Sequence, residues 1–351
     1  MTAMADLHGP RAPRWRYTLL NRDDQPLRKL IGVTGGGVDV DATTRLRAAG
    51  NLTIEEMGQE IDWLSHRVRI SYDPGIPGVS EWPVATMLLS SPKESYRGKR
   101  LVYDVGLLGK LAIIDETSVK GTYSVPAGAV VIDRVLELIN DCGERRYSVS
   151  PSTAVTRSAM VWKPGTSYLT IINDLLSSIG YWSLWCDGAG VFRIEPYVDP
   201  GDRLSAFDFA AGARAVHSPD WDRDQDLSSI PNIAIVVSQG DGEQPAIVGT
   251  AWNLDPRDPF SIPNRGREIP VIDEGAEVDS QATADLLAAR LLRDARSAVA
   301  HLSVQHFVVP LNPNDVVSFA PSGAAARRAS VQAMRYTFTF NGWVEAEWRE
   351  L

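Results

Sequence analysis

The chain has 351 residues, with 35 basic and 44 acidic side chains and a formal net charge of -9. Hydrophobic residues make up 44% and charged residues 23%, an ordinary globular composition that excludes disordered, collagen-like and disulfide-scaffold proteins. The acidic balance argues against a general duplex-binding protein, because affinity for phosphates requires clustered Lys and Arg. At roughly 100 to 200 residues per domain, the length predicts two or three domains.

The N-terminus lacks the apolar core of a secretory signal peptide, and no stretch of about 18 apolar residues occurs in the chain. We therefore expect no export by the general secretory route and no membrane insertion. Cys142 and Cys186 are too few for a disulfide framework and fit assembly in a reducing compartment, with one bridge between them left open.

The opening of the chain predicts an arm followed by strands. Residues 1–13 contain few large apolar groups, which predicts an extended arm with no local partner that becomes ordered on assembly. From Trp15, short runs of alternating apolar and polar residues predict antiparallel strands over residues 14–103, as in a barrel or sandwich. The triplet Gly35–Gly37 is interpreted as a hairpin turn, and the alternative is an anion cradle.

The middle of the chain, residues 104–203, predicts a small central α+β domain. Apolar residues at helical spacing predict helices over 131–142 and 168–179, each followed by a glycine stop. Two short apolar runs around Asp187-Gly188 then predict a hairpin.

The closing part, residues 204–351, predicts a second barrel or sandwich. Strand patterns return there, with a turn at 240–242 and an inserted helix at about 281–297. The chain closes with a hairpin whose turn is Asn341-Gly342. Strand-rich segments thus open and close the chain without a visible sequence repeat, which leaves an internal duplication of one fold as an open possibility.

Motifs for enzyme chemistry are poor in this sequence. It contains no nucleophile elbow, no phosphate-binding loop of the P-loop type and no H-E-x-x-H zinc motif. His301 and His306 lie five residues apart in a strand pattern, so their side chains are expected on opposite faces. Cys142 and Cys186 lie among apolar residues and are interpreted as buried small hydrophobes.

The acidic run from Asp220 to Asp226 has alternating carboxylates like the start of a calcium loop. It lacks the glycine and the distant glutamate of such loops, so we interpret it as a solvated loop. The alternative is a hydrolase that uses Asp220, Asp222 or Asp224 with a bound cation. The ten tryptophans are interpreted as core and subunit contacts, and the alternative is a carbohydrate-binding module with Trp platforms. We predict no catalytic, cofactor or metal site.

Three blocks resemble hub or minor tail proteins of tailed bacteriophages, the actinobacterial phage group related in fold to the contractile-phage baseplate hub. They are a helix, glycine stop and hairpin over Ser167–Pro196, an opening strand over Arg16–Asp23, and the proline and D-V-V segment of Leu311–Val317. The resemblance implies a mainly β fold with an α+β part, in which two β-barrel-like hub domains flank a small central α+β domain.

The resemblance also implies a structural, non-enzymatic role in the virion tail tip, after assembly in the host cytoplasm. It implies a homotrimeric ring that closes the distal tail tube and contacts distal tail or tube rings, the tape measure protein C-terminus, tail fibres and penetration proteins. The acidic balance fits a lumen through which DNA passes without specific binding. A spike hub of a contractile injection machine is the alternative. Hydrolase activity and receptor recognition are expected to belong to other proteins or to be absent.

Overall fold

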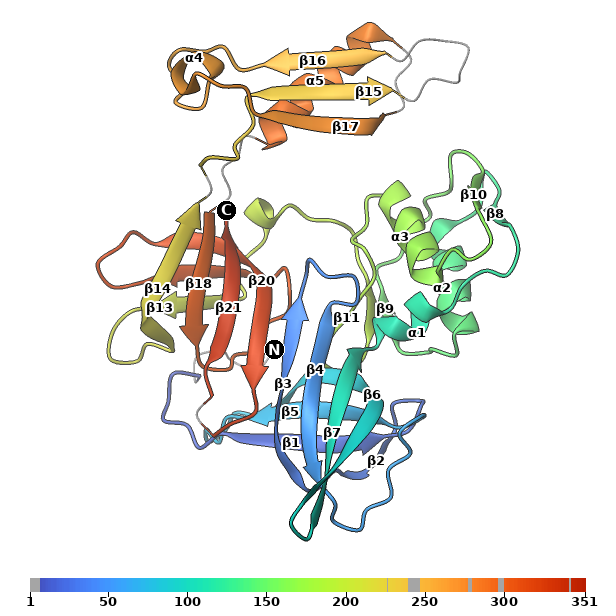
Figure 1. The fold of residues 1–351 in the computed structure, drawn as a ribbon, viewed down its shortest axis with the longest axis vertical. Helices are drawn as coiled ribbons and strands as arrows, with labels where there is room; N and C mark the ends of the chain where they lie inside the picture. Colours follow the sequence, from blue (N-terminus) through green and yellow to red (C-terminus); the bar gives the residue numbers. More distant parts are fainter. Residues whose placement is uncertain (1–6, 226, 239–246, 277–279, 296–299, 341) are drawn as a thin grey trace. The chain divides into compact units, whose positions relative to one another are not determined.

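The computed structural model describes residues 7–225, 227–238, 247–276, 280–295, 300–340 and 342–351. The chain forms two compact units, the first made of residues 1–222 with 302–351 and the second of residues 223–301 (Figure 1). Strands hold 43% of the residues and helices 15%, so the predicted mainly β fold is confirmed. The predicted domain boundaries near residues 13, 103 and 203 stay a prediction.

One sheet of 13 strands, here called the joined sheet, runs through the first unit. Its order is β14-β18-β21-β20-β3-β4-β7-β6-β5-β1-β2, and β19 connects β20 to β13 beside this path. The strands are β1 (Arg14–Leu20), β2 (Pro26–Lys29), β3 (Val33–Asp41), β4 (Ala48–Glu55), β5 (Arg67–Asp73), β6 (Trp82–Arg97), β7 (Arg100–Gly109), β13 (Phe207–Ala210), β14 (His217–Gln225), β18 (Ala300–His306), β19 (Val316–Ala320), β20 (Arg327–Thr337) and β21 (Val344–Glu350).

The joined sheet contains the same strand order twice. In the first half, strands β1, β3, β4, β5, β6 and β7, numbered one to six along the chain, lie side by side in the order 2-3-6-5-4-1. In the second half, β13, β14, β18, β19, β20 and β21 lie in the same order, 2-3-6-5-4-1. Strand β2 is an addition to the first half. The duplication that the sequence left open is therefore present at the level of strand order, although β13 runs parallel to β19 where β1 runs antiparallel to β5.

The two halves are joined by antiparallel pairing of β20 with β3. Ala333 pairs with Asp41, and the register continues to Thr337 opposite Gly37. The backbone amide of Phe338 then donates to the carbonyl oxygen of Gly36 over 3.0 Å. This junction makes one continuous sheet from segments at opposite ends of the chain.

Gly35–Gly37 lie inside β3, so the predicted hairpin turn is wrong. Gly36 has a φ of 136°, and a Cβ on it would lie 2.2 Å from the carbonyl oxygen of Asn51 on β4. A Cβ on Gly37 would lie 2.6 Å from the carbonyl oxygen of Tyr336 on β20. Gly36 and Gly37 are needed because β3 is closely flanked by a strand on each side.

One hydrophobic core fills both halves. It includes buried side chains from β1, β4, β5 and β7 together with those from β13, β18, β20 and β21. The Trp15 ring lies 4.8 Å from Phe338, and the Tyr17 ring lies 5.7 Å from it, so aromatic contacts follow the strand junction. The halves are thus packed together as well as hydrogen-bonded.

The arm is held by the first unit along its described part, so the prediction that it becomes ordered only on assembly is wrong for residues 7–13. Leu7 is 4% exposed, and the Arg11 guanidinium donates to the carbonyl oxygen of Val308 over 2.6 Å. The amide of Ala12 donates to the carbonyl oxygen of Pro74 over 3.0 Å. These contacts reach both halves, which the local sequence could not show. Residues 1–6 lie outside the described residues.

The central α+β part, which lies between the two halves along the chain, has its own core. The predicted helices and hairpin are confirmed, and Ser167 caps its helix by accepting from the amide of Thr170 over 3.2 Å. The elements are α1 (Leu111–Glu116), β8 (Tyr123–Val125), α2 (Val131–Asp141), β9 (Tyr147–Val149), β10 (Met160–Trp162), α3 (Tyr168–Ser178), β11 (Trp185–Cys186), β12 (Phe192–Ile194) and the 3-10 turn Pro200–Asp202.

The second unit is inserted between β14 and β18 along the chain. Helix α5 packs on a three-stranded sheet, and the helix covers most of the predicted range 281–297, of which 296 and 297 lie outside the described residues. The predicted turns at 240–242 and at Asn341 also involve residues outside that description. In the described ranges no helix is long and apolar enough to cross a membrane. The elements are β15 (Ile233–Ser238), β16 (Val248–Trp252), α4 (Ile262–Arg265), β17 (Pro270–Ala276) and α5 (Gln281–Ala295).

Four buried charges connect the first half to the central part. Lys110 Nζ lies 2.6 Å from Asp24 and 2.9 Å from Glu144, and the Arg67 guanidinium lies 2.8 Å from Asp24 and 2.6 Å from Glu144. The four side chains form a closed ring of alternating charge, each at most 8% exposed. Lys110 also donates to the carbonyl oxygen of Gly190 over 2.9 Å. The ring fixes the β1–β2 turn, β5 and the segments after β7 and α2 to one another.

Replacing Lys110 by methionine should lower the free energy of unfolding by about 3 to 5 kcal/mol. The substitution leaves Asp24 and Glu144 in a site closed to water with one cation fewer, and an uncompensated buried charge is costly. Denaturant unfolding measures the effect, with the exposed Lys120→Met as the matched control. If the free energy of unfolding falls by only about 1 kcal/mol, the size of a surface ion pair, the ring has no structural role.

Candidate functional surface: the acidic face of the joined sheet

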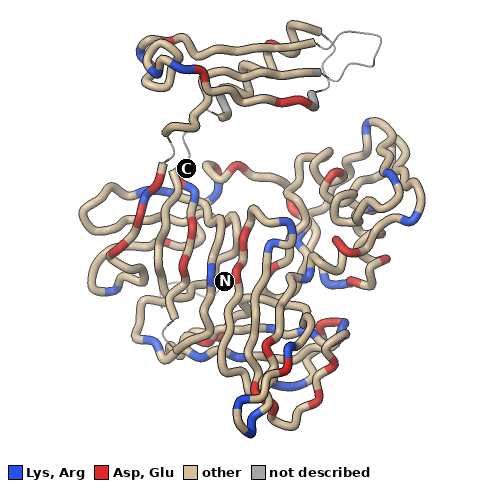
Figure 2. The backbone as a smooth tube through the Cα atoms, in the orientation of Figure 1, with Lys and Arg blue, Asp and Glu red and all other residues tan. Residues whose placement is uncertain are grey.

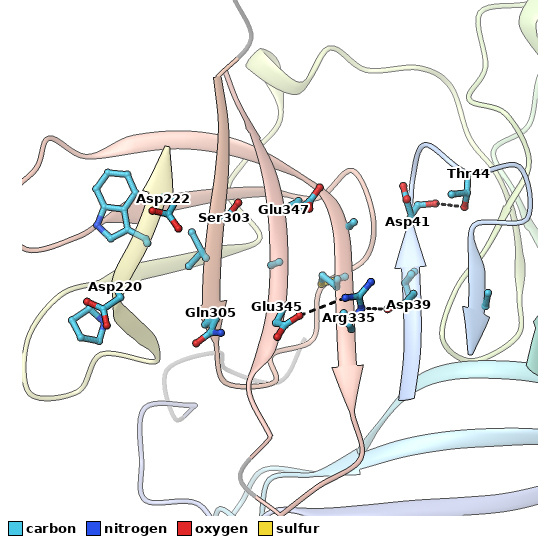
Figure 3. Close-up of a pocket in the computed structure, with 18 residues that line it drawn as sticks. Asp39, Asp41, Thr44, Asp220, Asp222, Ser303, Gln305, Arg335, Glu345 and Glu347 are labelled. Atoms are coloured by element: carbon cyan, nitrogen blue, oxygen red, sulfur yellow. Dashed lines mark hydrogen bonds and ion pairs between the residues drawn. The ribbon is translucent and has the colours of Figure 1, made fainter. Parts of the chain in front are cut away.

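An open groove of about 940 Å³ lies on the outer face of β14, β18, β21, β20 and β3 (Figure 3). It spans the junction of the two halves. Six carboxylates line it, against one guanidinium, Arg335, so the formal charge of the lining is six negative and one positive, or -5. We call this surface the acidic face, and its carboxylates are Asp39, Asp41, Asp220, Asp222, Glu345 and Glu347.

Strand alternation places these carboxylates on one side of the sheet. On β21, Val344, Ala346 and Trp348 are buried, and the intervening Glu345 and Glu347 face outward. On β3, the buried Val38 precedes Asp39 in the same way. The apolar set forms the core and the acidic set faces the solvent, so one sequence pattern generates both.

Arg335 lies at the centre of the acidic face, on the strand junction. Its Nε lies 2.7 Å from Asp39 of the opposite strand, and another guanidinium nitrogen lies 3.7 Å from Glu345. The hydrogen bond with Asp39 raises the pKa of Arg335 above its ordinary value. Asp41, Asp220, Asp222 and Glu347 form no ion pair with the described residues, so most of the negative charge is directed to solvent.

The acidic run at 220–226 is a strand through Gln225, so its interpretation as a loop is wrong, and Asp226 lies outside the described residues. The alternation of the carboxylates with other residues could have predicted this strand. Asp220 and Asp222 are two residues apart and therefore share a face of β14. Both side chains enter the acidic face. No three His, Cys, Asp or Glu side chains of the described ranges come together as metal ligands.

The histidines of β18 lie on opposite faces, as predicted, because His301 is exposed and His306 is fully buried. The His306 ring lies 4.9 Å from Phe209 and 5.7 Å from Trp348, behind the acidic face. Its Nδ1 is 2.7 Å from the carbonyl oxygen of Phe307, whereas its Nε2 has no partner. Burial lowers the pKa of His306 to about 4.

Both cysteine thiols are free, so the bridge that the sequence left open is absent. Burial raises the pKa of Cys186 to about 12, as expected of a thiol that serves as a small hydrophobe. Eight of the ten tryptophans are buried or half-buried, which confirms the predicted core role for most of them. Trp252 and Trp343 are the exposed ones; they belong to different units, and Trp343 stacks on Phe307 at 4.4 Å.

No family model and no curated protein matches this sequence. Solved structures do match its fold. A tail protein from Neisseria meningitidis MC58 superposes with a TM-score of 0.67 at 13% identity and covers 96% of each chain. The 43 kDa tail protein of prophage MuSo2 from Shewanella oneidensis gives 0.65 at 14% identity, covering 96% of this chain and 98% of its own.

This chain has the fold of phage tail proteins. The tail fold is shared with the E. coli c3393 protein, a type VI secretion component described as similar to the T4 tail proteins gp27 and gp5. That match has a TM-score of 0.50 at 12% identity and covers 97% of this chain and 74% of the other. The resemblance seen in the sequence is thus confirmed at the level of the tail fold.

Acidification should destabilise the tail fold partly through His306. The unfolded chain binds a proton near the ordinary pKa of 6.5, whereas the folded chain binds it only near 4. The contribution of neutral His306 to the free energy of unfolding is therefore complete above pH 6.5. It is lost as the pH falls toward 4, at about 1.4 kcal/mol per pH unit. Denaturant unfolding of the wild type and His306→Phe between pH 7 and pH 4.5 measures this. If the free energy of unfolding falls equally with pH in the two proteins, His306 does not contribute to the loss.

Proposed function

We propose that this chain is a non-enzymatic hub subunit of a phage tail tip, and that three copies form a ring closing the distal tail tube. The repeated strand order carries this proposal. Each copy supplies two equivalent halves, so a ring of three copies has six equivalent halves and pseudo-sixfold symmetry. A ring of six equivalent parts can match a tail tube built from hexameric rings.

In this ring the acidic face lines the lumen. A wall with a formal charge of -5 per copy repels phosphate groups, so DNA passes without being held. The groove is open and lacks the clustered cations that phosphate binding requires. The other surfaces of the ring serve as contacts for distal tail or tube rings, the tape measure protein C-terminus, tail fibres and penetration proteins. The subunit is assembled in the host cytoplasm and resides in the virion.

A hub of a contractile injection machine is the second candidate, because the fold also occurs in a type VI secretion component. Both candidates require a ring. They differ in what the lumen transmits, because an injection machine that carries protein has no need of a wall that repels nucleic acid. The acidic face favours the phage role.

The purified protein should have a mass of about three times 38.4 kDa. Light scattering over a tenfold concentration range measures the mass, and negative-stain imaging of the main peak should show rings. A monomer at every concentration, without rings on the grid, would contradict the proposed trimer.

Charge reversal on the acidic face should create DNA binding. Glu345→Lys with Glu347→Lys changes the lining from -5 to -1, because each reversal adds two charges. The variant ring should retain a short DNA duplex in fluorescence anisotropy at low salt and release it as salt rises, whereas the wild type should not bind. The matched control is Asp133→Lys with Asp141→Lys on α2. Equal DNA binding by the control would show that binding does not depend on where the charges are reversed, and would contradict a lumen-lining role for the acidic face.

A further inference from the structure

Strands β3 and β14 occupy equivalent positions in the two halves, but only β3 has a strand on both sides. Each is the second strand of its half, next to the third strand, β4 or β18. The other side of β3 is paired with β20 of the second half. The corresponding side of β14, over residues 219–222, pairs with no strand in the described part of the chain. One of two equivalent edges is therefore filled and the other is vacant.

Strands β6 and β20 are also equivalent, since each is the fifth strand of its half. They too differ in how many strands they pair with. Strand β20 pairs with β19 through Arg327–Ser330 and with β3 through Ala333–Thr337, on the side away from β21. Strand β6 pairs with β5 as far as Leu88, and among the described residues its remainder pairs only with β7. The segment of β6 that corresponds to the β3-binding part of β20 is thus vacant on the same side.

We propose that β14 of one copy pairs with the distal part of β6, residues 89–97, of the neighbouring copy. This contact repeats between subunits the β3–β20 junction that exists within each subunit. It deepens the proposed ring and rests on it. The contact joins two different surfaces, as a ring of identical subunits requires. The strand directions agree, because β14 runs opposite to β18 just as β3 runs opposite to β4 (Figure 1).

The charges of the two vacant edges are complementary. The end of the β6–β7 hairpin, residues 93–100, is here called the ribbon, and blue segments gather there in Figure 2. It carries four cations, Lys93, Arg97, Lys99 and Arg100, against one carboxylate, Glu94. Of these four, Arg100 pairs with Glu55, whereas the other three have no ion pair with the described residues. Strand β14 carries Asp220 and Asp222, which have no ion pair either. Within the subunit the junction has the same polarity, with the cation Arg335 on β20 and the carboxylate Asp39 on β3.

The ribbon is built as a projecting element with little support of its own. Its register shifts between Ser90 and Lys93, a bulge that redirects a strand pair. Beyond this point β7 is the only strand that pairs with β6 among those the structure describes, and Tyr96 is 73% exposed. A two-stranded ribbon is marginal in water, and a third strand stabilises it. Strand β14 of a neighbouring copy supplies that strand.

Charge reversal on the ribbon tests this contact. Lys93→Glu with Arg97→Glu should reduce the mass in light scattering from three chains to one at low salt, and so should Asp220→Lys with Asp222→Lys. Combining all four substitutions exchanges the two charges across the contact and should restore the ring. The matched control, Lys120→Glu with Arg157→Glu on the exposed surface of the central part, should remain a trimer. Thermal unfolding checks that each variant folds.

The outcomes separate this contact from the ring itself. A trimeric wild type whose mass is unchanged by either pair of reversals would overturn the β14–β6 contact and leave the proposed hub standing. A trimer lost in the ribbon variant but not restored by the fourfold variant would also overturn the pairing of these two edges. A wild type that is monomeric throughout would overturn the ring and this contact together.

Discussion

The pairing of β3 with β20 is the constraint on which the first unit depends. It brings residues near 40 against residues near 335, makes a continuous sheet and brings two apolar faces into one core. Such a contact between distant segments is entropically expensive to form and needs many cooperative interactions. The shared aromatic cluster of Trp15, Tyr17 and Phe338 supplies part of them at the same place. The acidic face exists only because this junction aligns strands from both halves.

Local structure could be predicted from the sequence where it depends on local spacing. The amphipathic stretches with glycine stops became α2 and α3, and the hairpin after α3 formed where Asp187-Gly188 indicated it. The errors arose where distant segments decide the outcome. Gly35–Gly37 resembles a turn in isolation, yet close approach by Asn51 and Tyr336 makes it the middle of a strand.

The candidate surface was predictable only in part, for the same reason. The run from Asp220 was noticed for its charge, but its role required a strand partner more than 75 residues later in the chain, β18. Asp39, Arg335 and Glu345 carry no motif, and they become one surface only after β3, β20 and β21 are paired. The ring of Asp24, Arg67, Lys110 and Glu144 was missed likewise, because its members come from four separate segments.

Duplication alone does not specify assembly, because two equivalent halves could close on each other and leave nothing for a further copy. Here the halves share one junction, and the equivalent edges at either end of the pair have no strand partner in the part of the chain that the structure describes. The intramolecular junction fixes how one half is placed on the next, and repeating that operation builds a series of halves. A series built by one repeated operation either closes as a ring or continues as a filament. In the proposed ring, successive acidic faces point toward a common axis, and the counter-ions of a water-filled lumen screen the repulsion among them.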